Sequence, residues 1–294
     1  RFRDLLTQSG FSEINGVQEQ GILEMAFSDI NFLYSLSGFF VGMIVGFTGV
    51  GGGSLMTPVL VLLFGVHPAT AVGTDLLYAA ATKTVGATIH NKAKSVDWAV
   101  VRRLAAGSVP ATLLTFAAMQ ALDLHASKGG ALAVMLGVVL LMTSITLLFR
   151  SRIVEFMARR VASTSPGMVT AQTVITGVVL GALVTTTSVG AGAIGVTALL
   201  IIYPRLPTLR IVGSDIAHAV PLTLISGLGH WYMGSVDVGM LLSLLIGSIP
   251  GIALGSTIAP RLPERALRIL LAIILVLVSL KLILRGKRIG FSLA

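Results

Sequence analysis

The stretch Gly42-Met-Ile-Val-Gly46-Phe-Thr-Gly49-Val-Gly51-Gly52-Gly53-Ser54-Leu-Met-Thr-Pro58 decides the fold of this chain. It lies inside an apolar run, about 36–64, in which three consecutive glycines and a following proline disfavour an unbroken helix. In hydrocarbon, an unwound backbone is tolerated only where it is buried in protein or lines a wet cavity. We therefore expect a break, followed by a helix that restarts near Ser54 and aims its free N–H groups at an anion.

The composition places the chain in the membrane. Of its 294 residues, 54% are hydrophobic and 11% are charged, against roughly 25% charged residues in an average soluble domain. Several apolar stretches are near or above the roughly 20 residues that span a bilayer. They lie at about 36–64, 69–91, 98–121, 130–149, 168–203, 209–231, 238–258 and 266–284. The sequence predicts an all-α integral membrane protein with about eight hydrophobic segments.

Charge and residue usage exclude several other classes of function. The net charge of +9 falls on a chain with short loops, so we assign it to cytoplasmic loop bias and to attraction by anionic lipid headgroups. The expected partner is the lipid bilayer, and no nucleic acid is needed to explain the charge. The chain has no cysteine, which excludes disulfides and thiolate chemistry. The histidines and carboxylates show no metal-ligand spacing and no catalytic triad, so we expect no metal, no cofactor and no enzyme.

The chain contains two copies of one unit. At an offset of 140 residues, the stretch from Val72 to Asp75 matches that from Val212 to Asp215, and the stretch from Gly107 to Pro110 matches that from Gly247 to Pro250. At an offset of 139, Gly51 and Gly53 match Gly190 and Gly192. The sequence therefore predicts two homologous halves, each with a glycine-broken first segment. We expect an N-terminal tail or surface helix at 1–31, membrane repeats at 32–150 and 168–288, a basic linker at 151–167 and a C-terminal tail at 289–294.

The second broken segment runs from Gly181 to Gly195 and carries Ser188, Gly190 and Gly192. Small residues alone could serve close helix packing, whereas their duplication in a two-repeat membrane protein favours a site between the repeats. If the broken segments fold back, each half crosses the membrane three times and the halves are inverted; if they span it, there are eight crossings. The basic residues are compatible with either arrangement.

Lys83 lies within an apolar segment, where a lysine near mid-membrane costs at least about 2.5 kcal/mol on insertion scales. It could bind an anion or form a structural ion pair with Asp75 or Asp215. Its position in the second half is held by Thr223, so the predicted site is asymmetric.

Two carboxylates and a histidine accompany this lysine. Asp215 and His218 are three residues apart on one expected helix face, and a carboxylate beside an imidazole is a plausible proton carrier near neutral pH. Asp75 and Asp215 occupy equivalent places near helix starts, where capping of backbone N–H groups is the alternative.

Several of these motifs together resemble one family. The motifs are the glycine-rich run from Gly42 to Pro58, the stretch from Ala71 to Ala79, the block from His90 to Trp98, and the later His218-Ala-Val-Pro221 and Gly229-His-Trp231. They resemble the TauE/SafE sulfite exporter family. The resemblance implies a permease of the bacterial inner membrane with two related four-segment halves, which moves small sulfur-containing anions such as sulfite or organosulfonates, usually outward.

The resulting hypothesis is a secondary transporter coupled to protons. N–H groups near two sets of residues would hold the anion: Gly51, Gly52, Gly53 and Ser54 in the first half, and Ser188, Gly190 and Gly192 in the second. Lys83 would supply positive charge, and Asp75, Asp215 or His218 would carry the coupling proton. The alternatives are an anion channel and a non-transporting membrane scaffold subunit. Homo-oligomerisation is left open.

Overall fold

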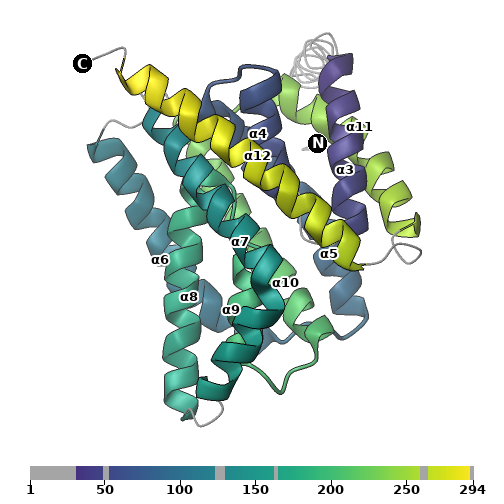
Figure 1. Ribbon diagram of the computed structural model, residues 1–294, viewed down its shortest axis with the longest axis vertical. Helices are drawn as coiled ribbons and strands as arrows, with labels where there is room; N and C mark the ends of the chain where they lie inside the picture. The colour runs from purple at the N-terminus through teal and green to yellow at the C-terminus, as the bar shows by residue number, and fades with distance from the viewer. Residues whose placement is uncertain (1–30, 49–52, 123–129, 162–164, 259–263, 292–294) are drawn as a thin grey trace, which may run out of the picture.

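The computed structural model describes residues 31–48, 53–122, 130–161, 165–258 and 264–291. These residues form helices throughout, joined by short turns (Figure 1). The helices are α3 (Phe32–Thr48), α4 (Gly53–Leu63), α5 (Pro68–Lys92), α6 (Trp98–Ala121), α7 (Gly130–Val161), α8 (Pro166–Thr187), α9 (Ile194–Ile202), α10 (Thr208–Tyr232), α11 (Val238–Ile258) and α12 (Glu264–Phe291). The all-α prediction is confirmed for the described residues.

Five of the described helices are long and apolar enough to cross a membrane, by length and composition: α6, α7, α8, α10 and α11. The predicted number of about eight segments is not confirmed. Two reasons are visible in the chain. The helices α3, α4 and α9 contain 17, 11 and 9 residues, and α5 carries Asp75 and Lys83 within its length.

The first two helices of each half form a helical hairpin, which we call the first hairpin (α3 and α4) and the second hairpin (α8 and α9). In the first hairpin, the ring of Tyr34 near the start of α3 lies 4.6 Å, centroid to centroid, from that of Phe64 just after α4. In the second, the Thr173 hydroxyl near the start of α8 lies 2.8 Å from the Tyr203 hydroxyl just after α9. These two contacts are equivalent at the offset of 139 residues, so both segments fold back on themselves.

Apart from the short helices α4 and α9, each described helix packs mainly against a helix of the other half. The extensive helix pairs are α3 with α11, α6 with α8, α5 with α10, and α7 with α12. In Figure 1 the long helices α7 and α12 cross the front of the molecule side by side. The interface between the halves is therefore the main packing surface of the described fold.

Counterpart helices of the two halves run in opposite directions. Gly73, early in α5, touches Ser235 just beyond the end of α10, and Gly227, late in α10, touches Leu77 of α5. On the other pair, the Ser144 hydroxyl of α7 donates to the Ala272 carbonyl of α12 at 2.8 Å. The pairs α5–α10 and α7–α12 are thus antiparallel. This geometry corresponds to the fold-back alternative, in which the two halves are inverted.

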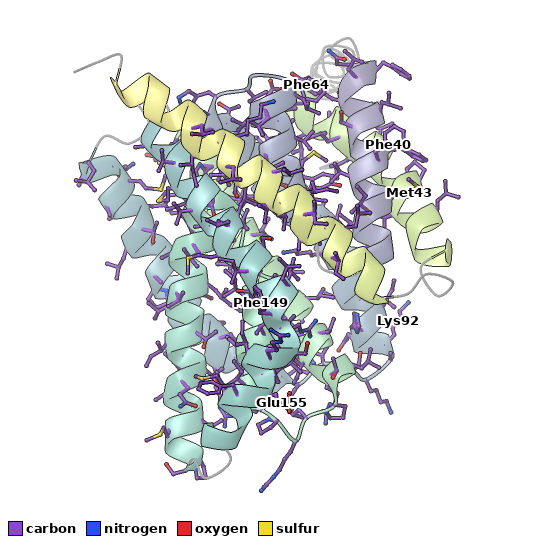
Figure 2. The ribbon with its side chains drawn as sticks, in the orientation of Figure 1. Phe40, Met43, Phe64, Lys92, Phe149 and Glu155 are labelled. Carbon is purple, nitrogen blue, oxygen red and sulfur yellow. The ribbon has the colours of Figure 1, made fainter. Side chains whose placement is uncertain are left out.

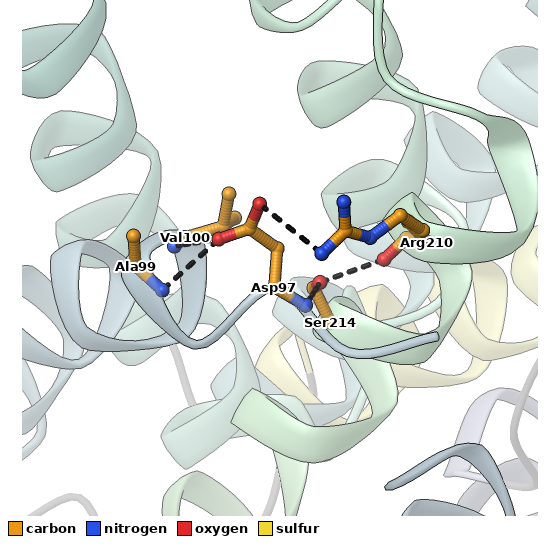
Figure 3. Close-up of polar contacts among 5 residues, drawn as sticks. All are labelled: Asp97, Ala99, Val100, Arg210 and Ser214. Atoms are coloured by element: carbon orange, nitrogen blue, oxygen red, sulfur yellow. Dashed lines mark hydrogen bonds and ion pairs between the residues drawn. The ribbon is translucent and has the colours of Figure 1, made fainter. Parts of the chain in front are cut away.

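The turns before α6 and α11 dock reciprocally on the opposite half, and Figure 3 shows the contacts of the first of these turns. The Asp97 N–H donates to the Ser214 hydroxyl at 2.8 Å, and the Asp237 N–H donates to the Thr74 hydroxyl at 3.1 Å. Asp97 Oδ1 also caps α6 by accepting from Ala99 at 3.0 Å, and its Oδ2 lies 4.0 Å from the Arg210 guanidinium. These contacts hold the ends of α5 and α10 against the other half.

Candidate functional site

The tip of the second hairpin is a turn that contains three residues with positive φ. Ser188, directly after α8, has φ of 59°, and Gly190 and Gly192 have φ of 126° and 100°. Glycine adopts this region at no steric cost, whereas a serine in it is uncommon. The predicted residues of the second broken segment therefore form a turn in which Ser188 is 5% exposed.

The tip of the first hairpin is only partly described. Gly51 and Gly52 lie outside the described residues, and α4 begins at Gly53 and continues through Ser54. The predicted helix restart near Ser54 falls within this first turn.

Asp75 contacts α4 at Thr57, the fifth residue of that helix. Its side chain is fully buried, and its Oδ2 accepts the backbone N–H of Thr57 at 3.1 Å and the Thr57 hydroxyl. Asp75 lies in the interior of α5, so it does not cap its own helix. It is an acceptor for the helix that follows the first break, where a backbone N–H and the dipole both favour a negative charge.

Asp215 takes the corresponding place in the second half. It is 1% exposed, and its carboxylate interacts with the backbone N–H of Gly192 at the hairpin tip. A Cβ on Gly195, in the first turn of α9, would overlap Oδ1 of Asp215. Each aspartate thus faces the short helix of the hairpin in its own half, which is α4 for Asp75 and α9 for Asp215.

Lys83 is the positively charged residue near both aspartates. It extends from α5, is 7% exposed, and interacts electrostatically with both Asp215 and Asp75. Its counterpart Thr223 turns its hydroxyl to the Ala219 carbonyl of its own helix at 2.8 Å. The predicted asymmetry at this position is therefore present in the fold.

His218 faces a serine from α6. Its Nε2 lies 2.8 Å from the Ser108 hydroxyl, and both residues are buried. At the 140-residue offset, Tyr78 corresponds to His218 and Ser248 to Ser108; the Tyr78 hydroxyl lies next to the Ser248 side chain. The two halves therefore repeat one pattern, an aspartate followed three residues later by a ring that faces a serine.

Several buried polar atoms of this cluster make no hydrogen bond to the residues that the structure describes. They are Asp75 Oδ1, Tyr78 Oη, Ser188 Oγ, Asp215 Oδ1 and His218 Nδ1. Buried polar atoms are nearly always paired in folded proteins. Their concentration around Asp75 and Asp215 therefore indicates a place that accepts water, a proton or a ligand.

The structure brings Asp75, Lys83, Asp215 and His218 together, and sets Ser188 near Asp75. Sequence reasoning missed Thr57, Ser108 and Tyr78. The repeat offset could have revealed Tyr78 and Ser108, because their counterparts are His218 and Ser248. Nothing could have revealed Thr57, whose counterpart at the 139-residue offset is Val196. Among the described residues, no three histidine or carboxylate side chains gather as metal ligands.

The fold and this cluster define a class: a multi-pass, all-helical membrane protein with charged side chains buried between two inverted halves. Apolar side chains that point outward, among them Leu114, Ile249 and Leu277, suit a lipid surface. Figure 2 shows further apolar side chains, such as Phe40 of α3 and Phe149 of α7, on the outside of the bundle.

The chain belongs to the sulfite exporter TauE/SafE family, whose pattern matches residues 34–282. It is 36% identical over 254 residues to the probable membrane transporter protein YjnA of Bacillus subtilis, covering 84% of this chain and 98% of the relative. It is 28% identical over 235 residues to the probable membrane transporter protein YdhB of the same organism, covering 78% and 91%. A probable membrane transporter protein of Xylella fastidiosa is 28% identical, covering 76% and 83%. No solved structure matches the chain significantly.

Proposed function

We propose that this protein is a secondary transporter that exports small sulfur-containing anions, such as sulfite or organosulfonates, across the bacterial inner membrane with coupling to protons. The observation that carries the proposal is the buried group of Asp75, Lys83 and Asp215, in which the lysine interacts with both carboxylates. Ionisable residues inside a membrane are expensive and mark substrate and ion pathways. The family membership supports the transport of sulfur oxyanions.

The proposed architecture has eight apolar segments in two repeats, 32–150 and 168–288, with the two hairpins as re-entrant segments. Non-helical backbone at membrane depth is tolerated where protein buries it, which suits the tip around Ser188 and Gly190. Alternating access would rock one repeat against the other around the site between them. The turn at Lys92 would then face the cytoplasm, where basic residues are favoured.

The proposed binding site combines backbone and side-chain groups. N–H groups at the two hairpin tips would hold the oxyanion oxygens: Gly51, Gly52, Gly53 and Ser54 at the first tip, and Ser188, Gly190 and Gly192 at the second. Lys83 would supply the positive charge, because it interacts electrostatically with both Asp75 and Asp215. Asp75, Asp215 or His218 would carry the coupling proton.

Two other functions would use the same fold. An anion channel would pass the substrate without saturation or counterflow, and a scaffold subunit would pass none. Neither accounts for a lysine that is buried between two carboxylates at the meeting point of the halves.

The test is counterflow of labelled sulfite in proteoliposomes, with sulfate, sulfoacetate and acetate as competitors. Wild type is expected to accumulate label. The Lys83→Met variant is expected to lose about tenfold or more of the rate, since removing one partner of a buried charge group costs about 2–5 kcal/mol. Lys92→Met, an exposed lysine at the end of the same helix, is the matched control and should behave as wild type.

Absence of counterflow in wild type would contradict the carrier proposal. Undiminished counterflow in a correctly folded Lys83→Met protein would remove the role assigned to this lysine while leaving the carrier proposal in place.

A further inference from the structure

We propose that Asp75 and Asp215 are tethered anions that occupy the substrate's binding positions, so that a substrate anion enters only when the carboxylate there has taken up a proton. Anion and proton would then cross the membrane in the same direction. This inference rests on the proposed function and deepens it, because it fixes the sign of the coupling between proton and substrate: an outward gradient of the anion would drive export and would carry protons outward against their usual inward gradient.

The first argument is the donor set around Asp75. An oxyanion bound at the start of α4 would need the backbone N–H and hydroxyl groups that point at that position. Thr57 already directs both its N–H and its hydroxyl to Oδ2 of Asp75. The chain's own carboxylate therefore occupies the anion position in front of these two Thr57 donors.

The second argument is the space around Asp215. The carboxylate lies where a Cβ of Gly195 would be, and the Gly192 N–H interacts with it from the hairpin tip. The site has no room beside Gly195 for a second anion while the carboxylate is in place. A substrate must displace it.

The third argument is the set of buried atoms that lack a hydrogen bond to any described residue. Oδ1 of Asp75 and Oδ1 of Asp215 are both in this state, and the Ser188 hydroxyl interacts with the Asp75 carboxyl without a well-formed hydrogen bond. A protonated carboxyl group becomes a donor, so a proton on Oδ1 would turn each aspartate from a competitor of the substrate into a hydrogen-bond partner for it.

The charges that face the two carboxylates support the same direction of coupling, in which proton and anion move together. Asp75 faces Lys83 and the Tyr78 ring from its own helix, with Thr57 and Ser188 from the hairpins. Asp215 faces Lys83 of α5 and Arg150 of α7, and Lys83 also interacts with His218 on the helix of Asp215. The two carboxylates share Lys83, so a substrate anion that arrived with both still ionised would compete with them for the same buried cation.

The probe for the experiment is labelled methanesulfonate, which remains a monoanion at every pH used. Proteoliposomes hold equal concentrations inside and outside, the membrane potential is clamped at zero, and the outside is made one pH unit more acidic. One-to-one symport predicts accumulation inside by up to about tenfold, since a tenfold proton ratio supplies the free energy of a tenfold substrate ratio. Antiport predicts depletion, and an uncoupled carrier predicts no change; either result overturns the inference.

The Asp75→Asn and Asp215→Asn variants separate the inference from a purely structural role for the carboxylates. Asparagine keeps the shape, offers an oxygen to the hairpin donors and carries no charge, as the protonated acid does. We expect each variant to lose the accumulation driven by the pH gradient, measured relative to its own counterflow rate at equal pH. Asp237→Asn, which changes an exposed carboxylate that caps α11, is the control and should keep both.

The outcomes distinguish the two proposals. If wild type shows no methanesulfonate counterflow at equal pH, the proposed function fails for sulfonates and the inference fails with it. If counterflow occurs and either asparagine variant still accumulates substrate in response to the pH gradient, the transporter proposal stands and the inference alone is wrong.

Discussion

Nε2 of His218 and the hydroxyl of Ser108 lie 2.8 Å apart in a buried contact between α10 and α6. The counterpart contact, between the side chains of Tyr78 and Ser248, joins α5 and α11. The ring–serine pairs therefore link the two halves at symmetrical places beside the two aspartates.

Ser108→Ala removes the partner of a buried imidazole nitrogen. A buried polar group without a partner costs about 1–3 kcal/mol, and we expect this loss in thermal unfolding of the purified protein in detergent. Ser95→Ala removes the 2.9 Å contact to the half-buried His90 and should cost less, because water can reach that ring. Equal losses in the two variants would show that burial of His218 is not the cause.

Gly195→Ala places a methyl group on the Asp215 carboxylate. Because the overlapping atoms are the end of a side chain, we expect the protein to fold and the carboxylate to move. Counterflow should fall about tenfold or more, in line with the loss of a well-placed charged contact. The matched control is Gly167→Ala in the first turn of α8, where a Cβ meets open space; it should transport as wild type. Normal transport by Gly195→Ala would show that the position of the Asp215 carboxylate does not matter for transport.

The asymmetric pair Lys83 and Thr223 allows the cation to be moved between the halves. Lys83→Thr alone should abolish counterflow. Adding Thr223→Lys should restore a measurable part of it, because the buried position on α10 is related to that on α5 by the repeat and lies 1% exposed in the same interface. The ratio of the double to the single variant in counterflow rate is the readout. A ratio of one would mean that the two positions are not interchangeable.

Opposite directions of α5 and α10 give a prediction for membrane sidedness. The natural chain has no cysteine, so single-cysteine variants need no further background changes. Lys92→Cys and Tyr232→Cys lie at equivalent exposed ends of the two helices. An impermeant maleimide should label them from opposite faces of the membrane. Labelling of both from one face would contradict the inverted arrangement.

The all-helical membrane class and the TauE/SafE family could be predicted from the sequence, because hydropathy and the glycine-rich and Ser-Val-Asp motifs are local signals. The buried partner of Asp75 could not. Thr57 is an ordinary small residue in an apolar helix, and only the packing of α4 on α5 brings it to the carboxylate.

The relative orientation of the two halves also could not be predicted from the sequence. Basic residues are compatible with both arrangements, whereas the contacts Tyr34–Phe64 and Thr173–Tyr203 bring the start of α3 to the end of α4 and the start of α8 to the end of α9. Ring and hydroxyl contacts between residues 30 positions apart leave no periodic pattern. They could have been expected only by comparing the two repeats at the ends of their broken segments.

The reciprocal contacts Asp97–Ser214 and Asp237–Thr74 bear on how such a chain could have arisen. Each half donates to the other the same hydrogen bond that it receives. A single unfused repeat could make these bonds only with a copy of itself inserted in the opposite orientation. The ancestor of the chain would then have been a dual-topology protein, and the joining of its two orientations in one polypeptide would have freed positions such as Lys83 and Thr223 to diverge.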